Sequence, residues 1–148
     1  TNHRMGLFDA VLIKDNHLAM MDSLNDEPMD EIRLAIEHAR KWTHKHADRL
    51  PHGKKTIVQI EVDRLDQFEK AIEHNPDIVL LDNMNNQRLR QAVEIRDRQG
   101  KEILLEASGG VNLKTIGAIA QTGVDRISVG ALTHSSVNLD IGLDWQYG

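Results

Sequence analysis

Short apolar runs rich in β-branched residues recur along the chain at regular intervals. The first is "AVLIK" (10–14), and the later ones are "TIVQIEV" (56–62), "DIVLLDN" (77–83), "EILLEAS" (102–108) and "DRISVGAL" (125–132). Such runs are apolar at nearly every position, which is typical of strands buried on both faces, and therefore of a parallel sheet.

Segments with helical spacing of apolar residues separate these strands. The longest spans about 29–45, and three shorter ones run from Leu65, from Leu89 and from Ile116. Asn85 and Asn112 are the expected N-caps of the last two, and Gly100 and Gly123 the expected C-terminal caps. A short final strand is expected within 139–144.

The alternation of strands and helices predicts an α/β fold, specifically a parallel (β/α) barrel, with a doubly wound sheet as the alternative. A complete eight-unit barrel usually needs roughly 250 residues, whereas this chain has 148. The expectation is therefore an incomplete barrel, cut from a longer polypeptide.

Composition narrows the functional classes. Apolar residues make up 40% and charged residues 28%, which favours a soluble globular protein. The absence of cysteine excludes disulfides, thiol catalysis and cysteine-bound metals. A net charge of −5 argues against nucleic acid as a partner, and no run is long enough to cross a membrane. No signal peptide is visible at residues 1–8, so a cytoplasmic location is expected.

Polar groups stand where each predicted strand ends. These groups are Lys14, Asp15, Asn16 and His17, then Glu61 and Asp63, Asp82 and Asn83, Glu106, Ser108, Gly109 and Gly110, and finally Gly130, Thr133 and His134. Ligands bind at the carboxyl ends of the strands in parallel β/α folds. Any one of these groups could instead be a solvated loop residue, but five strand ends with the same habit predict an active site at this edge.

The residue types at this edge suggest two ligands. Glu61 and Asp82 come from equivalent points of adjacent strands and would repel each other unless a cation such as Mg²⁺ lay between them. The alternative is that one of them pairs with Lys14 or Arg4. Gly109 and Gly110 precede a helix start and could bind a phosphate through backbone N–H groups, although glycine pairs also form ordinary turns.

A cationic group completes the predicted site. His3 and Arg4 precede the first strand and, with Lys14, would neutralise carboxylates; a frayed terminus is the alternative for the first two.

The chain resembles the quinolinate phosphoribosyltransferase family. The stretches that match are "NHRMGLFDAVLIKDNH", "IEVD", "DIVLLDN", "LEASGGVN" and "TGVDRISVGALTHS", in family order over nearly the whole chain. The resemblance implies a C-terminal, TIM-like barrel domain over 1–148, truncated, without the N-terminal sandwich domain and first barrel strand of the family.

The resemblance also implies a reaction between quinolinate and 5-phosphoribosyl-1-pyrophosphate that gives nicotinate mononucleotide, pyrophosphate and CO₂ for NAD biosynthesis. His3, Arg4 and Lys14 would bind quinolinate, and Lys14, Glu61 and Asp82 would be catalytic. Mg²⁺ would be held by Glu61 and Asp82, which with Ser108, Gly109, Gly110, Gly130 and His134 would bind the phosphoribosyl pyrophosphate.

Family members form homodimers or larger homo-oligomers and have an Arg- and Lys-rich segment upstream that this sequence lacks. The 148 residues alone are therefore expected to be inactive or nearly so. The alternative function is that of a related pyridine phosphoribosyltransferase-like protein with another acceptor. Less favoured are a non-catalytic phosphate-binding barrel and an aldolase-type barrel in which Lys14 forms a Schiff base.

Overall fold

The computed structural model describes residues 9–18, 30–130 and 132. Within these ranges the chain alternates between strands and helices, as the hydrophobic pattern predicted. The predicted site residues His3, Arg4 and His134, together with the strand expected in 139–144, lie outside the described residues.

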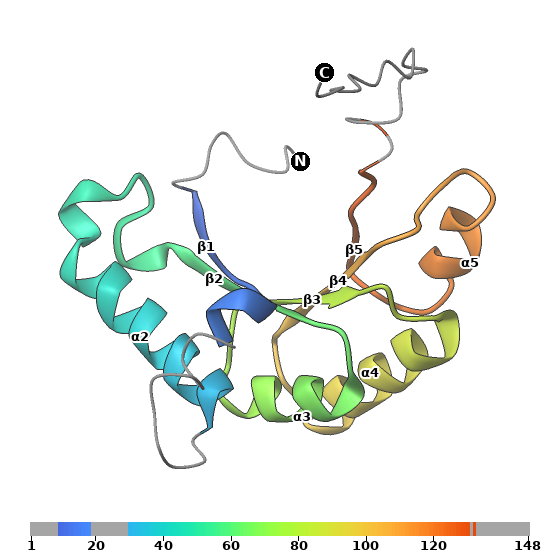
Figure 1. Ribbon diagram of the computed structural model, residues 1–148, viewed down its shortest axis with the longest axis horizontal. Coiled ribbons are helices and arrows are strands. Elements are labelled where there is room, and N and C mark those ends of the chain that lie inside the picture. Colours follow the sequence, from blue (N-terminus) through green and yellow to red (C-terminus); the bar gives the residue numbers. More distant parts are fainter. Residues whose placement is uncertain (1–8, 19–29, 131, 133–148) are drawn as a thin grey trace, which may run out of the picture.

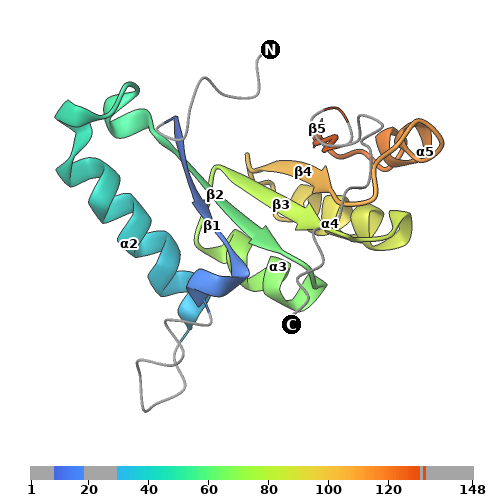
Figure 2. The same cartoon turned by 45° about the horizontal axis from the view of Figure 1, so that its top comes forward.

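Five strands form one parallel sheet in the order β1-β2-β3-β4-β5, which is also their order in the sequence. Their bounds are β1 Ala10–Ile13, β2 Ile57–Val62, β3 Ile78–Asp82, β4 Leu104–Ser108 and β5 Arg126–Ile127. All strands therefore point the same way, and their carboxyl ends lie along one edge of the sheet (Figure 2).

Four helices connect the strands on one side of the sheet. They are α2 Glu31–Lys45, α3 Leu65–Glu73, α4 Asn86–Arg98 and α5 Ile116–Ala120; a helical turn at 15–18 follows β1, and two 3₁₀ turns, η1 Ala47–Arg49 and η2 Gly53–Lys55, precede β2. Figure 1 shows the sheet as an arc with the helices around its outside. This arrangement is the expected parallel (β/α) barrel type, present as part of a barrel.

The aliphatic core lies between the sheet and the helices. Val58, Ile60 and Leu81 on the convex face of the sheet pack with Phe68 and Ile72 of α3, all with 2% or less of their surface exposed. The prediction that the strands are buried on both faces was wrong for β2, whose residues alternate between buried and half-buried. Among the described residues, helices cover the convex face alone, and concave-face residues of β2 such as Gln59 and Glu61 keep partial contact with solvent.

Strand β5 is shorter than predicted. The pattern indicated a strand over 125–132, but the ladder contains Arg126 and Ile127 alone, in register with Glu106 and Ala107. Within the described part of the chain β5 pairs with β4 and with no strand on its other side.

Helix starts agree with the prediction at one asparagine and differ at the other. The side chain of Asn85 caps α4 by accepting a hydrogen bond from the Arg88 N–H at 3.0 Å. The prediction for Asn112 was wrong, because α5 begins at Ile116 and has Thr115 at its N-cap. The Asn112 side chain instead accepts from the Lys114 N–H, and so closes a turn that precedes the helix.

Two carboxylates tie the amino ends of the strands to the helices. Asp77 accepts hydrogen bonds from the Val58 N–H and from Arg40 of α2, each at 2.7 Å. Asp125 does the same two repeats later, accepting from the Leu105 N–H and from Arg96 of α4. These contacts lie at the amino-terminal edge of the sheet, where residues of a β/α fold contribute to stability and not to ligand binding. No helix in the described ranges is long and apolar enough to span a membrane.

Candidate functional site at the strand ends

The register of the sheet places the polar strand residues on its concave face. Side chains alternate across a strand, and residues paired between neighbouring strands share a face. In β2 the buried Val58, Ile60 and Val62 face the helices, so Gln59 and Glu61 face the concave side. The same argument assigns Leu80 and Asp82 of β3, Glu106 and Ser108 of β4, and Arg126 of β5 to that side.

The stagger of the strands brings the predicted residues to similar levels. Gln59 donates a hydrogen bond to Glu106 two strands away, although the register pairs Gln59 with Ile78 and Ile78 with Leu104. The contact is thus offset by two residues, as in the interior layers of barrels built from alternate strands. One step further, the same offset brings Glu61 level with Ser108, and Lys14 level with Asp82.

An ion pair joins the ends of β1 and β2. Lys14 Nζ lies 3.6 Å from Glu61 Oε2, and the lysine side chain is half exposed while the glutamate is one-fifth exposed. The pairing of Glu61 with Lys14, which the sequence offered as an alternative to a metal role, is present in the structure. In partial contact with water the pair stabilises the fold little, and it leaves both groups able to turn toward a ligand.

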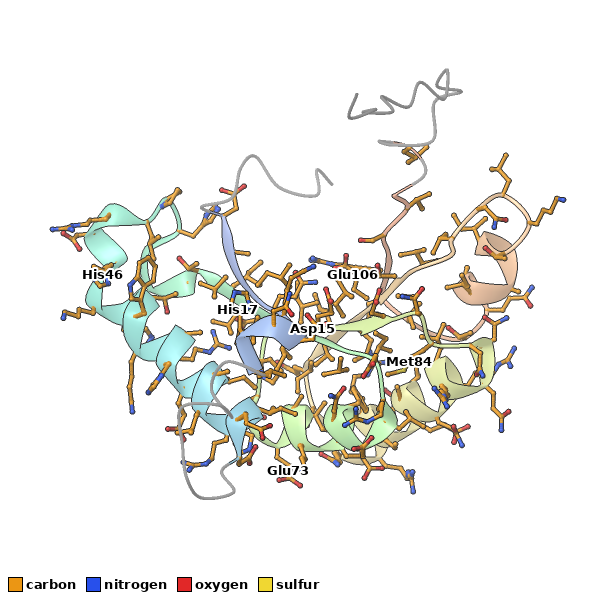
Figure 3. The ribbon with its side chains drawn as sticks, viewed as in Figure 1. Asp15, His17, His46, Glu73, Met84 and Glu106 are labelled. Carbon is orange, nitrogen blue, oxygen red and sulfur yellow. The ribbon has the colours of Figure 1, made fainter. Side chains whose placement is uncertain are left out.

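The backbone at Lys14 is fixed by His17. The Lys14 N–H donates to His17 Nδ1 at 2.9 Å, and the His17 N–H donates back to the Lys14 carbonyl at 2.9 Å. The bond from the Lys14 N–H to His17 is one half of a capping box, with histidine in the place of the usual Glu or Gln; the bond back goes to a backbone carbonyl, not to a side chain. Figure 3 shows Asp15 and His17 in the helical turn that follows β1. The sequence singled out His17 as polar but did not predict this capping role.

A second contact joins the ends of β3 and β4. Asp82 accepts a hydrogen bond from Asn83 Nδ2 at 2.8 Å, and the Asn83 N–H donates to the Ser108 carbonyl at 2.9 Å. Asn83 has a left-handed φ of +51°, a conformation that asparagine tolerates better than most residues. Gly109 then passes so close that a Cβ there would lie 2.1 Å from Asn83 Oδ1.

The glycine pair forms a tight turn after β4 rather than a helix start. Gly109 and Gly110 have φ values of +87° and +61°. The prediction that they directly precede a helix was wrong, because residues 111–115 separate them from the five-residue α5. A helix dipole therefore adds nothing here, and the remaining anion-binding groups are the backbone N–H groups of the turn.

Two carboxylates at this edge fit one kind of metal site. Among the residues that the structure describes, no three His, Asp or Glu side chains gather closely enough to hold an ion by themselves. This excludes an all-protein cage there but suits Mg²⁺, which proteins usually bind through one or two carboxylates with water and substrate phosphate completing the shell. Glu61 and Asp82 are the residues that would supply those carboxylates.

A hollow of about 250 Å³ lies beside the turn after β1. Five charged residues contribute to its lining, together with the apolar Leu18 and Ile32; the charged ones are Asp15, Glu31, Arg64, Asp66 and Lys70. The hydrogen bond from Arg64 lowers the pKa of Asp66 below its ordinary value, and the same contact raises the pKa of Arg64. A larger hollow of about 480 Å³ lies between β1 and α2, away from the strand ends, and contains none of the predicted site residues.

Comparison with known proteins gives consistent matches. Residues 1–144 match the family model described as quinolinate phosphoribosyl transferase, C-terminal domain. The chain is 41% identical over 143 residues to the carboxylating nicotinate-nucleotide pyrophosphorylase of Mycobacterium leprae, covering 97% of this chain and 44% of that protein.

Solved structures agree with the sequence matches. The nicotinate-nucleotide pyrophosphorylase of Francisella tularensis is 40% identical with a TM-score of 0.68, covering 89% of this chain and 40% of that one. The enzyme of the same name from Ehrlichia chaffeensis is 39% identical with a TM-score of 0.71, covering 96% and 44%. The chain thus spans less than half the length of these relatives.

Proposed function

Since this chain belongs to the quinolinate phosphoribosyl transferase family, we propose that the protein transfers the phosphoribosyl group of 5-phosphoribosyl-1-pyrophosphate to quinolinate in NAD biosynthesis. The products are nicotinate mononucleotide, pyrophosphate and CO₂. The observation that supports this most directly is the ion pair of Lys14 and Glu61, at the same strand edge where Asn83 lies between Asp82 and the glycine turn.

The first step of the proposed reaction requires no proton transfer by the protein. The quinolinate nitrogen forms a bond to C1 of the ribose while the bond from C1 to the pyrophosphate oxygen breaks. The 2-carboxylate is then lost as CO₂, and the ring carbon takes up a proton. A pyridine nitrogen has a free lone pair at neutral pH, so no base is needed to activate it. Catalysis then rests on positioning and on stabilisation of charge.

Lys14 is proposed to lie between the two substrates. Its half-exposed ammonium group can leave Glu61 for a quinolinate carboxylate, since the pair is weak in partial contact with water. His3 and Arg4 are proposed for the same carboxylates on sequence grounds.

Glu61 and Asp82 are proposed to bind the ribose hydroxyls and to hold Mg²⁺. When bound, the ion neutralises charge that develops on the departing pyrophosphate. The Asn83 amide, which donates to Asp82, holds that carboxylate in one orientation.

Backbone amides of Ser108, Gly109, Gly110 and Gly130 are proposed for the 5-phosphate, and His134 joins them on sequence grounds. The left-handed φ values of Gly109 and Gly110 support this, because turns of that kind direct successive N–H groups into one concavity. A homodimer or larger homo-oligomer and a cytoplasmic location stay predictions from the sequence.

The test is pyrophosphate release by the purified full protein, with the upstream Arg- and Lys-rich segment present, when it is mixed with 5-phosphoribosyl-1-pyrophosphate and each of quinolinate, nicotinate and other azine carboxylates. Release that depends on quinolinate is expected, and release with another acceptor instead would support the related-transferase alternative. Asp82→Asn should lower kcat about a hundredfold. Asp63→Asn is the matched control, because Asp63 lies just past the end of β2 with two-thirds of its side chain exposed. Equal activity of the two variants would contradict the proposed role of Asp82.

A further inference from the structure

A buried carboxylate lies beneath the proposed site. Glu106, in the middle of β4, is 2% exposed although its side chain belongs to the concave face. Figure 3 shows it on the side of the sheet away from α3 and α4. Its Oε2 accepts a hydrogen bond from Gln59 Nε2 of β2 at 3.3 Å, and its Oε1 accepts one from the hydroxyl of Ser128.

The position of this carboxylate calls for an explanation because burial disfavours charge. Within the described part of the chain, Glu106 has hydrogen-bond donors but no cationic partner. A leucine there would avoid the desolvation cost and would match the aliphatic Leu80, its register partner in the neighbouring β3. What a leucine cannot do is to bind two other elements of the sheet at once, one through each oxygen.

The two elements that Glu106 connects differ in how firmly they are held. β2 has strand neighbours on both sides, whereas β5 is two residues long and pairs with β4 alone among the described residues. Beyond the two register pairs, the Ser128 N–H donates to the Ala107 carbonyl at 2.9 Å. The hydrogen bond from the Ser128 side chain therefore helps to fix the chain just after β5, two residues before Gly130.

We propose that Glu106 is a positioning residue that anchors the end of β5 to the well-supported β2 through Ser128 and Gln59. It thereby holds the segment 128–130 facing the Ser108–Gly110 turn, so that both can contact one sugar phosphate. This role rests on the proposed function, because it assigns the segment to the phosphate of 5-phosphoribosyl-1-pyrophosphate. Glu106 itself touches no substrate in this arrangement.

The two-sided contact predicts which substitutions matter. Glu106→Leu and Ser128→Ala should each raise the Kd for 5-phosphoribosyl-1-pyrophosphate about fivefold, with kcat changed less than twofold. Glu106→Gln should stay near the wild-type Kd, since its amide can bond both partners. The double variant should be no worse than Glu106→Leu alone, because both changes break one network.

A control separates positioning from general stability. Thr122→Ala removes a buried hydrogen bond to the Ile119 carbonyl, in the connection between α5 and the amino end of β5, and should lower Tm without raising that Kd. Ser128→Ala covers the case in which Glu106→Leu fails to fold, since it removes one hydroxyl.

Calorimetric titration with 5-phosphoribosyl-1-pyrophosphate and the pyrophosphate-release assay together decide the matter. If Glu106→Gln weakens binding as much as Glu106→Leu, or if Ser128→Ala lowers Tm but leaves the Kd unchanged, the positioning role is wrong. If the full wild-type protein, with the upstream segment present, binds the sugar diphosphate but releases no pyrophosphate with quinolinate, the proposed function alone is overturned. Protein that does not bind it at all would overturn both.

Discussion

Gly109 offers the sharpest test of how the strand ends are joined. Its φ of +87° is a conformation that residues with a Cβ adopt at a cost, and a Cβ would lie 2.1 Å from Asn83 Oδ1 and 2.9 Å from the Asn83 backbone nitrogen. Gly109→Ala therefore demands two changes. The turn must accept a strained backbone, and Asn83 must move away from the new methyl group.

The expected cost follows from these two parts. A non-glycine residue at such a φ costs about 1–2 kcal/mol. Displacing the Asn83 amide also breaks its hydrogen bond to the Asp82 carboxylate, which adds about 1 kcal/mol at this partly exposed position. The backbone nitrogen cannot rotate away as a side chain can, so some movement of the β3 end is added. The sum for Gly109→Ala is about 2–4 kcal/mol.

Gly110→Ala is the matched control, one residue away. Its φ is +61°, but a Cβ there meets nothing within 4 Å. Backbone conformation alone should then cost about 1 kcal/mol. Urea unfolding of both variants, read by circular dichroism, measures the difference in the free energy of unfolding. Equal destabilisation by the two alanines would refute the packing of Gly109 against Asn83.

The same pair of variants tests the site. If the Asn83 amide orients Asp82, Gly109→Ala should lower kcat for pyrophosphate release by about tenfold in protein that is still folded, while Gly110→Ala acts mainly on the KM for 5-phosphoribosyl-1-pyrophosphate. Adding Asn83→Gly to Gly109→Ala removes the side-chain clash and should recover stability but not kcat. Recovery of kcat in that double variant would contradict the orienting role of Asn83.

Three further predictions concern other contacts. Asp77→Ala leaves the N–H of the fully buried Val58 without its acceptor and should lower the free energy of unfolding by about 2–3 kcal/mol. Its kcat/KM at 25 °C should be unchanged, because the contact lies at the amino end of the sheet. A loss of activity without a loss of stability would contradict this structural role. His17→Ala should lower stability by about 1 kcal/mol in urea unfolding, and glutamine at that position should restore most of it as a capping-box acceptor; no difference between the two would count against the cap. In Arg64→Ala, the pKa of Asp66 measured by NMR titration should rise toward the ordinary value of 3.8. Because this pKa is depressed in the folded protein, the small contribution of Asp66 to stability is present above 3.8 and disappears as pH falls through the folded pKa. An unchanged pKa in the variant would rule out the ion pair as the cause.

Most of the fold was predictable because strand and helix patterns are local. The apolar run at 56–62 and the helical stripe that begins at Leu65 each predicted their element to within one or two residues of its observed bounds. The two failures have different causes. The end of β5 depends on its pairing with β4, which is distant in sequence, so local composition could not indicate where the ladder stops. The start of α5 was misplaced because the side chains of Asn112 and Thr115 close a local turn after Gly110 instead of capping a helix at Asn112.

The candidate site was predictable in its membership more than in its contacts. Polar residues at successive strand ends must share an edge once the strands are parallel, so the grouping of Lys14, Glu61 and Asp82 follows from the sequence pattern. The ion pair of Lys14 and Glu61 was one of the alternatives that the sequence offered, and the structure contains it. The close approach of Gly109 to Asn83 could not be predicted, because the two residues follow different strands and their separation depends on how those strands pair in the sheet.

The sequence by itself determined the elements, their parallel order and the edge at which chemistry is expected, since all three follow from side-chain periodicity and from the direction of the chain. The tertiary structure alone decided which oxygens meet which donors. The stagger of the strands by two residues brings Glu106 beside Gln59 and Ser128, which lie 47 and 22 positions away along the chain. Such contacts arise from the curvature of the whole sheet, a collective property that no single segment of the sequence contains.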